Sequence, residues 1–439
     1  MMQALLAGIA MLATAASAQQ AFSTAKLDQF LDRLAEKNKG MGSLVLAKNG
    51  QAVYWRSFGY AQITASEKKP LSADTRYRIS SITKTYTAVM VFQLAEEGKL
   101  SLSTTLDRFF PQIPNAPRIT IAHILAHRSG IHDIEAGGGW AMQARTPDEV
   151  IARIAQGPSD FEPDTQHRYS NAGYNLLGYI VEKAGGKPYQ EALKERISSP
   201  IGLQDTYLGT GNTDPARHEA LSYRFLGEWK EAPELHFSVP GGAGAIVSTP
   251  ADMAKFIHAL FEGKLVKPES LKQMMTMRDG EGMGFESFTF GGKTFYGHTG
   301  GSNSSGSWLA YQPEDKLALA YVTNAKIYPV RDIVSGALDI YWGRPFQVPA
   351  FEAFQVPVEL LDKYTGTYTV PNAPAKARIT RQGSTLYFYP PGQSEGAALE
   401  ATAENKFRIE PAVSFEFDVA KGEMTVTRAG QRRVFRKEP

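Results

Sequence analysis

Three short motifs in this chain hold the side chains that could carry out acyl transfer. They are Ser81-Ile82-Thr83-Lys84, Tyr169-Ser170-Asn171 and His298-Thr299-Gly300. Acyl transfer needs a nucleophile, a base, an oxyanion site and groups that hold the substrate. A serine, a lysine, a tyrosine and a histidine in this order supply candidates for these tasks. The set therefore indicates a serine enzyme that works through an acyl intermediate.

Ser81 is the candidate nucleophile and Lys84 the candidate base. The helical pattern that starts at Ser81 runs to Gly98, so we expect the serine hydroxyl near the positive end of a helix. Lys84 follows three residues later on the same helix face, and a buried lysine can lose its proton near neutral pH. Ser-x-x-Lys also occurs at 23–26 and 66–69, where a capping serine and a solvated lysine are the simpler interpretation.

The other two motifs supply groups to relay protons and to hold a substrate. Tyr169 and Asn171 are two residues apart, and on a loop both can face one cleft, where a phenol relays protons and an amide donates to a carbonyl. The alternative for Tyr169 is a buried tyrosine with a hydrogen-bonded hydroxyl. The third motif should form a strand edge opposite the serine, where Gly300 lets a substrate backbone approach. The substrate-binding candidates are Asn171, His298, Thr299 and Gly300.

Together the motifs resemble those of the serine β-lactamase-like and penicillin-binding protein family, which includes class C β-lactamases, DD-peptidases, D-aminopeptidases and esterases. The resemblance runs from about Leu27 to about Tyr341. It implies an α+β fold, with an antiparallel sheet flanked by helices and a helical subdomain. It also implies that the N–H groups of Ser81 and Gly301 form the oxyanion hole.

His298 departs from the commonest pattern of the family, in which a lysine stands at this position. Some DD-peptidases and D-aminopeptidases of the family carry histidine there. A lysine is a permanent charge suited to a substrate carboxylate, whereas a histidine is mostly neutral at pH 7. The histidine therefore weakens the case for a strong penicillinase. The Ser-Asp-Asn motif of class A β-lactamases is not evident either.

Composition excludes several other kinds of chemistry. The chain has no cysteine, which excludes disulfides, thiol catalysis and cysteine-ligated zinc. His123 and His127 are four apart on a predicted helix, but Ile124 stands where a zincin pattern needs glutamate, so we interpret both histidines as core or polar-network residues. With 47 basic and 45 acidic residues, the chain has no basic footprint for nucleic acid. We expect no metal and no cofactor.

The amino-terminal residues predict export. Residues 5–15 form an apolar run that is too short to span a membrane, and Ala16-Ser17-Ala18 matches a cleavage pattern. We expect a signal peptide at 1–18, cut after Ala18, although no Lys or Arg precedes the apolar run; the alternative is a disordered or core-packed tail. The mature enzyme is then predicted to be periplasmic or secreted, without a stable membrane span.

The elements around the motifs favour an α+β body. Residues 24–37 predict a helix with Thr24 as its cap, and Lys48-Asn49-Gly50 between two apolar-rich runs predicts a hairpin. A helix followed by antiparallel strands is typical of an α+β layer rather than of a βαβ repeat. Further helices are expected at Ala122–His127, Tyr174–Ala184, Ala251–Phe261 and Val330–Trp342, and strand alternation at Phe295–Gly301 and Trp308–Thr323.

The last fifth of the chain has a different pattern. Pro345, Pro349 and Pro357 punctuate a stretch with little periodicity, so residues 345–357 are predicted to be a linker between a hydrolase domain at 19–344 and a second domain at 358–439. In that second domain, short apolar runs between Gly or Pro turns favour a small all-β barrel or sandwich. Its first segment resembles the lipocalin-like appendage behind some of these hydrolases.

The resemblance implies a serine hydrolase that acts through a Ser81 acyl-enzyme on peptides containing D-amino acids, and the amino-terminal residues predict that it is exported. DD-carboxypeptidase and D-aminopeptidase types both fit, with peptidoglycan stem peptides or nonribosomal peptides as substrates. A carboxylesterase and a class C-like β-lactamase are the alternatives among enzymes. From another class, a weakly catalytic penicillin-binding sensor would acylate once and stay acylated. The expected partner is a small peptide, ester or β-lactam.

Overall fold

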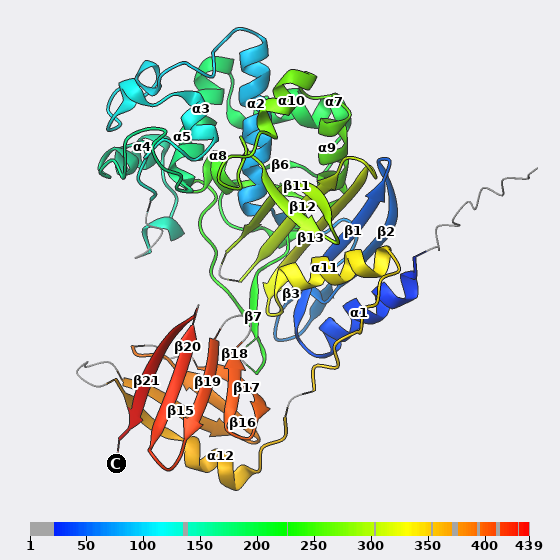
Figure 1. Cartoon of the computed structure of the whole chain (residues 1–439), viewed down its shortest axis with the longest axis vertical. Coiled ribbons are helices and arrows are strands. Elements are labelled where there is room, and N and C mark those ends of the chain that lie inside the picture. Colours follow the sequence, from blue (N-terminus) through cyan, green and yellow to red (C-terminus); the bar gives the residue numbers. More distant parts are fainter. Residues whose placement is uncertain are drawn as a thin grey trace, which may run out of the picture.

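The structure, a computed structural model, describes residues 22–134, 139–225, 227–302, 304–352, 354–370, 376–392, 396–409, 413–428 and 430–438. The predicted signal peptide at 1–18 lies outside these ranges. Figure 1 shows two parts, a body of helices around an antiparallel sheet and a barrel of strands at the carboxyl end. Among the described residues, no helix has both the length and the apolar character needed to cross a bilayer.

A six-stranded antiparallel sheet is the centre of the body. Its strands, in spatial order, are β10 (Glu286–Phe290), β11 (Lys293–Gly301), β12 (Gly306–Gln312), β13 (Leu317–Lys326), β1 (Gly40–Lys48) and β2 (Gln51–Phe58). Side chains of β1 alternate between two cores, because Leu44 and Leu46 pack on one face while Val45 and Ala47 pack on the other. Helices α1 (Thr24–Glu36) and α11 (Val330–Tyr341) cover the first face, and α2 (Thr83–Glu96) and α9 (Pro250–Phe261) contribute to the second core. The predicted α+β architecture is confirmed.

Local signals for the first helix and hairpin are largely confirmed. Asn49 and Gly50 have φ angles of 51° and 76°, as the mirror-image turn of a two-residue hairpin requires. The cap of α1 differs from the prediction by one residue: the Ser23 side chain accepts from the N–H of Lys26, and Thr24 is already helical. This serine of the first Ser-x-x-Lys motif is therefore a helix cap.

The helical part of the body is built around α2, whose side chains are buried on nearly all sides. It packs against α5 (Asn171–Gly185) and α8 (Gly241–Gly244). Gly178 and Gly242 bring α5 and α8 together, since a Cβ on Gly242 would lie 2.7 Å from the Gly178 Cα. The remaining helices of the body are α3 (Ile121–Leu125), α4 (Pro147–Ala155), α6 (Tyr189–Leu193), α7 (Ser199–Ile201), α10 (Pro268–Met274), η1 (Ser80–Ile82), η2 (Leu106–Arg108), η3 (Ala116–Arg118), η4 (Trp140–Met142), η5 (Lys194–Ser198) and η6 (Pro215–Arg217). Its short strands are β3 (Tyr60–Ile63), β4 (Lys68–Pro70), β5 (Tyr77–Arg78), β6 (Tyr207–Leu208), β7 (Tyr223–Phe225), β8 (Trp229–Glu231) and β9 (Ile246–Ser248).

Two predicted elements of the body are shorter than expected. The helix predicted at 122–127 is α3, which ends at Leu125, and His127 adopts a left-handed φ of 55°. His123 and His127 therefore do not share a helix face. The alternation predicted over 308–323 is two strands, β12 and β13, because the chain turns at residues 313–316.

The carboxyl-terminal part is a closed antiparallel barrel, so the barrel rather than the sandwich is confirmed. Its strands are β14 (Gly366–Thr369), β15 (Lys376–Gln382), β16 (Thr385–Tyr389), β17 (Ala397–Ala403), β18 (Lys406–Ile409), β19 (Val413–Asp418), β20 (Glu423–Arg428) and β21 (Gln431–Lys437). Pairing of β21 with both β20 and β14 closes the barrel. A helix that the sequence did not predict, α12 (Val358–Tyr364), precedes it and buries Leu361 and Tyr364 in the barrel core.

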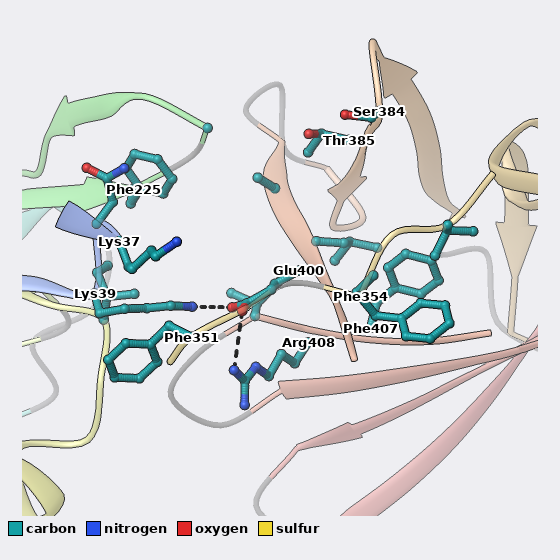
Figure 2. Close-up of a pocket in the computed structure, with 18 of the residues that line it drawn as sticks. Lys37, Lys39, Phe225, Phe351, Phe354, Ser384, Thr385, Glu400, Phe407 and Arg408 are labelled. Carbon is teal, nitrogen blue, oxygen red and sulfur yellow. Dashed lines mark hydrogen bonds and ion pairs between the residues drawn. The ribbon is translucent and has the colours of Figure 1, made fainter. Parts of the chain in front are cut away.

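The barrel and the body meet at a pocket of about 410 Å³ (Figure 2). Lys39, directly before β1, forms an ion pair with Glu400 of β17, and Arg408 donates to the same carboxylate at 3.3 Å. The Lys39 side chain is 8% exposed and that of Glu400 is 20% exposed. The segment between α11 and α12 also takes part, because the N–H of Phe354 donates to the Ala401 carbonyl. The contact is therefore anchored by a largely buried ion pair.

A hairpin of the body adds a second point of contact with the barrel. Between β7 and β8 the chain turns at Gly227, which has a φ of 88°. A Cβ there would lie 2.2 Å from the Tyr387 hydroxyl of β16, so the turn tip lies directly against the barrel. Figure 1 shows this hairpin reaching from the body toward the barrel.

Glu400→Gln should weaken the junction. The change removes the negative charge that compensates the buried Lys39, and breaking a largely buried ion pair costs about 1–3 kcal/mol. We expect a lower thermal midpoint and faster proteolysis within residues 342–357. Glu416→Gln is the control, since Glu416 is 50% exposed and pairs with Lys406 on the barrel surface. Equal behaviour of the two variants would show that the ion pair does not hold the junction.

Candidate active site

The candidate nucleophile Ser81 lies on a strained turn that leads directly into α2. The preceding residue, Ser80, has a φ of 49°, which is rare for a residue with a side chain. Two contacts hold the turn: Ser307 of β12 donates to the Ile79 carbonyl at 2.8 Å, and the Ile79 N–H donates to the Ile246 carbonyl. The turn is thus fixed by the sheet on one side and by β9 on the other, and Ser81 stays partly exposed.

The amino group of Lys84 is fully buried behind the serine. Its Nζ donates to Ser81 Oγ at 3.1 Å, to Asn171 Oδ1 at 2.8 Å and to the Ala243 carbonyl at 3.0 Å. Burial lowers the pKa of Lys84 to about 7, although nearby carboxylates oppose the shift. The neutral amine is therefore accessible near neutral pH, one contact away from the serine hydroxyl.

Tyr169 lies beside both Ser81 and Lys84. Its hydroxyl is hydrogen-bonded to Ser81, and the Nζ of Lys84 lies 4.6 Å from its ring centre. Burial raises the pKa of Tyr169 well above its usual value, so the phenol keeps its proton at neutral pH. Ser81, Lys84 and Tyr169 thus form a compact group in which each member can exchange a proton with its neighbour.

The ring of His127 stacks on the ring of Tyr169. The two rings stack with centroids 4.3 Å apart, and His127 Nδ1 accepts from the Ser170 N–H at 3.1 Å. Burial and the nearby Lys84 lower the pKa of His127 far below its usual value, so the ring is neutral. It belongs to a buried polar network, as we expected from the sequence. Among the described residues, no group of three or more acidic or histidine side chains is arranged to hold a metal ion.

Asn171 is the first residue of α5, and a carboxylate that the sequence analysis missed fixes its amide. Asn171 Nδ2 donates to Asp133 Oδ2 at 2.9 Å while its Oδ1 accepts from Lys84. The other oxygen of Asp133 accepts the N–H of Ala172 at 2.8 Å. Asp133 therefore decides which end of the amide faces Lys84. Asp133 and Asn171 are 38 residues apart, so no local pattern connects them.

The third motif lies on β11, at the edge that faces the serine turn. His298 is buried, and its Nδ1 lies 2.5 Å from the Thr299 carbonyl, which can only accept, so this nitrogen carries the proton. Burial lowers the pKa of His298, which leaves the ring neutral at pH 7. The Thr299 N–H and hydroxyl both donate to Glu286 of β10, at 2.8 and 2.9 Å. Thr299 and the backbone that follows it are partly exposed, whereas the His298 side chain is buried.

Gly300 allows this edge to touch the serine turn. A Cβ on Gly300 would lie 2.5 Å from the Ile79 carbonyl oxygen and 2.9 Å from the Ser81 nitrogen. Gly301, the last residue of β11, is exposed and pairs with Gly306. The backbone of the motif thus reaches the Ser81 N–H, as an oxyanion hole built from Ser81 and Gly301 would require.

Comparison with known proteins agrees with this geometry. The model of the Beta-lactamase family matches residues 27–337. Penicillin-binding protein 4* of Bacillus subtilis (strain 168) is 27% identical over 432 residues, which cover 90% of this chain and 94% of that protein. Esterase EstB of Burkholderia gladioli is 30% identical over 223 residues, covering 46% of this chain and 56% of that protein.

A solved structure is similar over the body. D-amino acid amidase from Ochrobactrum anthropi SV3, complexed with L-phenylalanine, superposes with a TM-score of 0.64 and 28% identity. The match covers 72% of this chain and 97% of that one. Nearly the whole amidase chain therefore superposes on this protein, which supports the same fold for the body.

The acylation rate should rise with pH between about 6 and 8, with a midpoint near the Lys84 pKa of about 7. Above that pKa the neutral amine, which can accept the serine proton, is the main form. Asp133 is the first of the carboxylates that raise the Lys84 pKa, so Asp133→Asn should move the midpoint to lower pH. Rapid-mixing acylation kinetics would measure it, with the exposed Asp148→Asn as control. A midpoint that stays or rises would contradict the assignment of Lys84 as base.

Gly300→Ala should lower the acylation rate by on the order of 10²-fold, because the new methyl group would push β11 away from the serine turn. Gly185→Ala is the matched control, since a Cβ there meets only Leu94 at 3.8 Å. Labelling of Ser81 by a fluorophosphonate reports the rate, and circular dichroism checks folding. Wild-type labelling by a folded Gly300→Ala protein would show that this close approach does not matter.

Proposed function

We propose that this chain, which belongs to the Beta-lactamase family and is a serine hydrolase, cleaves amides of D-amino acids through an acyl-enzyme on Ser81. The observation that carries the proposal is the buried Lys84 amine, with its pKa of about 7 and its contact to Ser81 Oγ. In this proposal, residues 1–18 direct export and are removed after Ala18.

Acylation uses the three clustered groups in sequence. Neutral Lys84 takes the hydroxyl proton of Ser81 as the serine oxygen bonds to the substrate carbonyl carbon. The N–H groups of Ser81 and Gly301 stabilise the oxyanion. When the C–N bond breaks, the Tyr169 hydroxyl gives its proton to the leaving nitrogen and takes the proton held by Lys84. The amine leaves, and the acyl group stays on Ser81.

Deacylation reverses the same proton path with water as nucleophile. Water gives a proton to the Tyr169–Lys84 pair while its oxygen bonds to the acyl carbon. Collapse of the second tetrahedral intermediate returns that proton to Ser81 Oγ and releases the acid. Asn171, held by Asp133 and Lys84, lies beside this path, where we place it as a positioning group as well as a substrate contact.

The substrate class rests on similarity and on His298. The likeness to a D-amino acid amidase over 72% of the chain supports an amide of a D-amino acid. His298 is buried and neutral, so it offers no positive charge to the carboxylate of a penicillin. This argues against a class C-like β-lactamase as the main activity.

A carboxylesterase is the second candidate, favoured by the similarity to Esterase EstB. An ester would use the same acylation steps, except that its alcohol leaving group needs less help from a proton donor. Tyr169→Phe should therefore slow amide cleavage more than ester cleavage. If the protein turned over p-nitrophenyl esters but no amide, the esterase would replace the amidase as the function.

Ser81→Ala should abolish fluorophosphonate labelling and turnover, and Tyr169→Phe should slow acylation by an amide by on the order of 10²-fold. Ser66→Ala is the matched control, because it removes the serine of an exposed Ser-x-x-Lys sequence. The assay compares p-nitroanilides of D- and L-alanine, with D expected to be faster. Labelling of the Ser81→Ala protein would show that Ser81 is not the nucleophile. A preference for the L-isomer would refute the proposed substrate class. Stoichiometric acylation without turnover would indicate the sensor protein.

A further inference from the structure

Glu286 occupies the place beside the third motif where a carboxylate-binding enzyme needs donors. It lies on β10 opposite Gly297, and its side chain is 21% exposed. The Thr299 N–H and hydroxyl both point to its carboxylate, at 2.8 and 2.9 Å. The donors that Thr299 could offer to a substrate carboxylate are therefore already given to a carboxylate of the protein.

His298 does not restore a positive charge at this position. Its Nδ1 is directed to the Thr299 carbonyl at 2.5 Å and lies 3.9 Å from Glu286 Oε1. The ring is buried, and this proton goes to the backbone. A second carboxylate brought here would meet Glu286 with no compensating cation from the motif, and like charges at such distances repel.

Glu286 keeps capacity to bind a cation. An ionised carboxylate has about four acceptor positions, and Thr299 uses mainly Oε2, with its hydroxyl also 3.2 Å from Oε1. The oxygen Oε1 can therefore accept from a further donor on the exposed side. The Glu286 carboxylate also lies close enough to the reacting groups for its charge to raise the pKa of both Lys84 and Tyr169.

We propose that Glu286 is a specificity-determining residue that favours substrates with a free, protonated amine close to the scissile amide bond and disfavours substrates whose leaving group carries a carboxylate. The proposal deepens the proposed function and rests on it. It narrows the substrate class to free amino-acid amides and the amino ends of peptides. The protein would then act as an aminopeptidase or amidase on D-residues rather than as a carboxypeptidase.

The test compares three substrates that share one acyl-transfer chemistry: D-alanine p-nitroanilide, its N-acetyl derivative, and N-acetyl-D-alanyl-D-alanine with its free carboxylate. Glu286→Gln keeps an oxygen for Thr299 and removes the charge. We expect kcat/KM for the free-amine substrate to fall about tenfold, through KM rather than kcat, the scale of one lost charge partner. Loss of the Glu286 charge also lowers the pKa of Lys84, which affects acylation by all three substrates alike. The diagnostic result is therefore a fall of about tenfold in the ratio of kcat/KM for the free-amine substrate to that for the N-acetyl substrate, with a rise in the ratio for the carboxylate substrate to the N-acetyl substrate.

Glu359→Gln is the matched control, because Glu359 is exposed on α12 in the barrel part. An equal loss on all three substrates in Glu286→Gln, or a wild-type enzyme that prefers the carboxylate substrate, would overturn the role of Glu286. Either result can occur while Ser81 is still labelled by a fluorophosphonate and an amide is still turned over. Failure of that labelling in the wild type would instead refute the proposed function.

Discussion

The burial of one amino group, that of Lys84, is the constraint on which the rest of the site depends. A charged amine inside a protein is costly unless its donors are satisfied. Here three elements supply an acceptor each: Ser81 of η1, Asn171 at the start of α5, and the Ala243 carbonyl of α8. The same burial that makes these acceptors necessary brings the pKa to about 7, so the structural requirement and the chemical one have a single origin.

Close packing of backbone makes this convergence possible. Gly178 and Gly242 let α5 and α8 approach until a Cβ would clash, and Gly300 does the same for β11 and the serine turn. Each glycine lacks a side chain at a contact between two elements, where even one methyl group would meet backbone atoms of the facing element. The distances between the elements of the site thus depend on these glycines as much as on the polar side chains.

The sequence could predict the motifs and most of the helices and strands around them, because these follow from local periodicity and turn residues such as Asn49-Gly50. It could not predict Asp133 or the Ala243 carbonyl, since one contact spans 38 residues and the other uses a backbone atom that carries no side-chain signal. The strand β17 is hard to predict from the sequence, because its residues, Ala-Ala-Leu-Glu-Ala-Thr-Ala, include few of the β-branched and aromatic types that strands favour. The burial of His298 could not be predicted either, because alternation along a strand defines two faces without showing which of them is buried.

The junction with the barrel and the proposed oxyanion edge share one piece of backbone. Lys39, whose side chain pairs with Glu400 of the barrel, accepts at its carbonyl from the N–H of Tyr328. Just before that residue, the N–H of Lys326 donates to the Ser304 carbonyl and its amino group donates to the Ser302 carbonyl at 2.7 Å. Ser302 follows Gly301 directly. The end of β13 therefore contacts Lys39 of the junction on one side and the turn after β11 on the other, so a continuous set of contacts joins the barrel to the segment that carries Gly301.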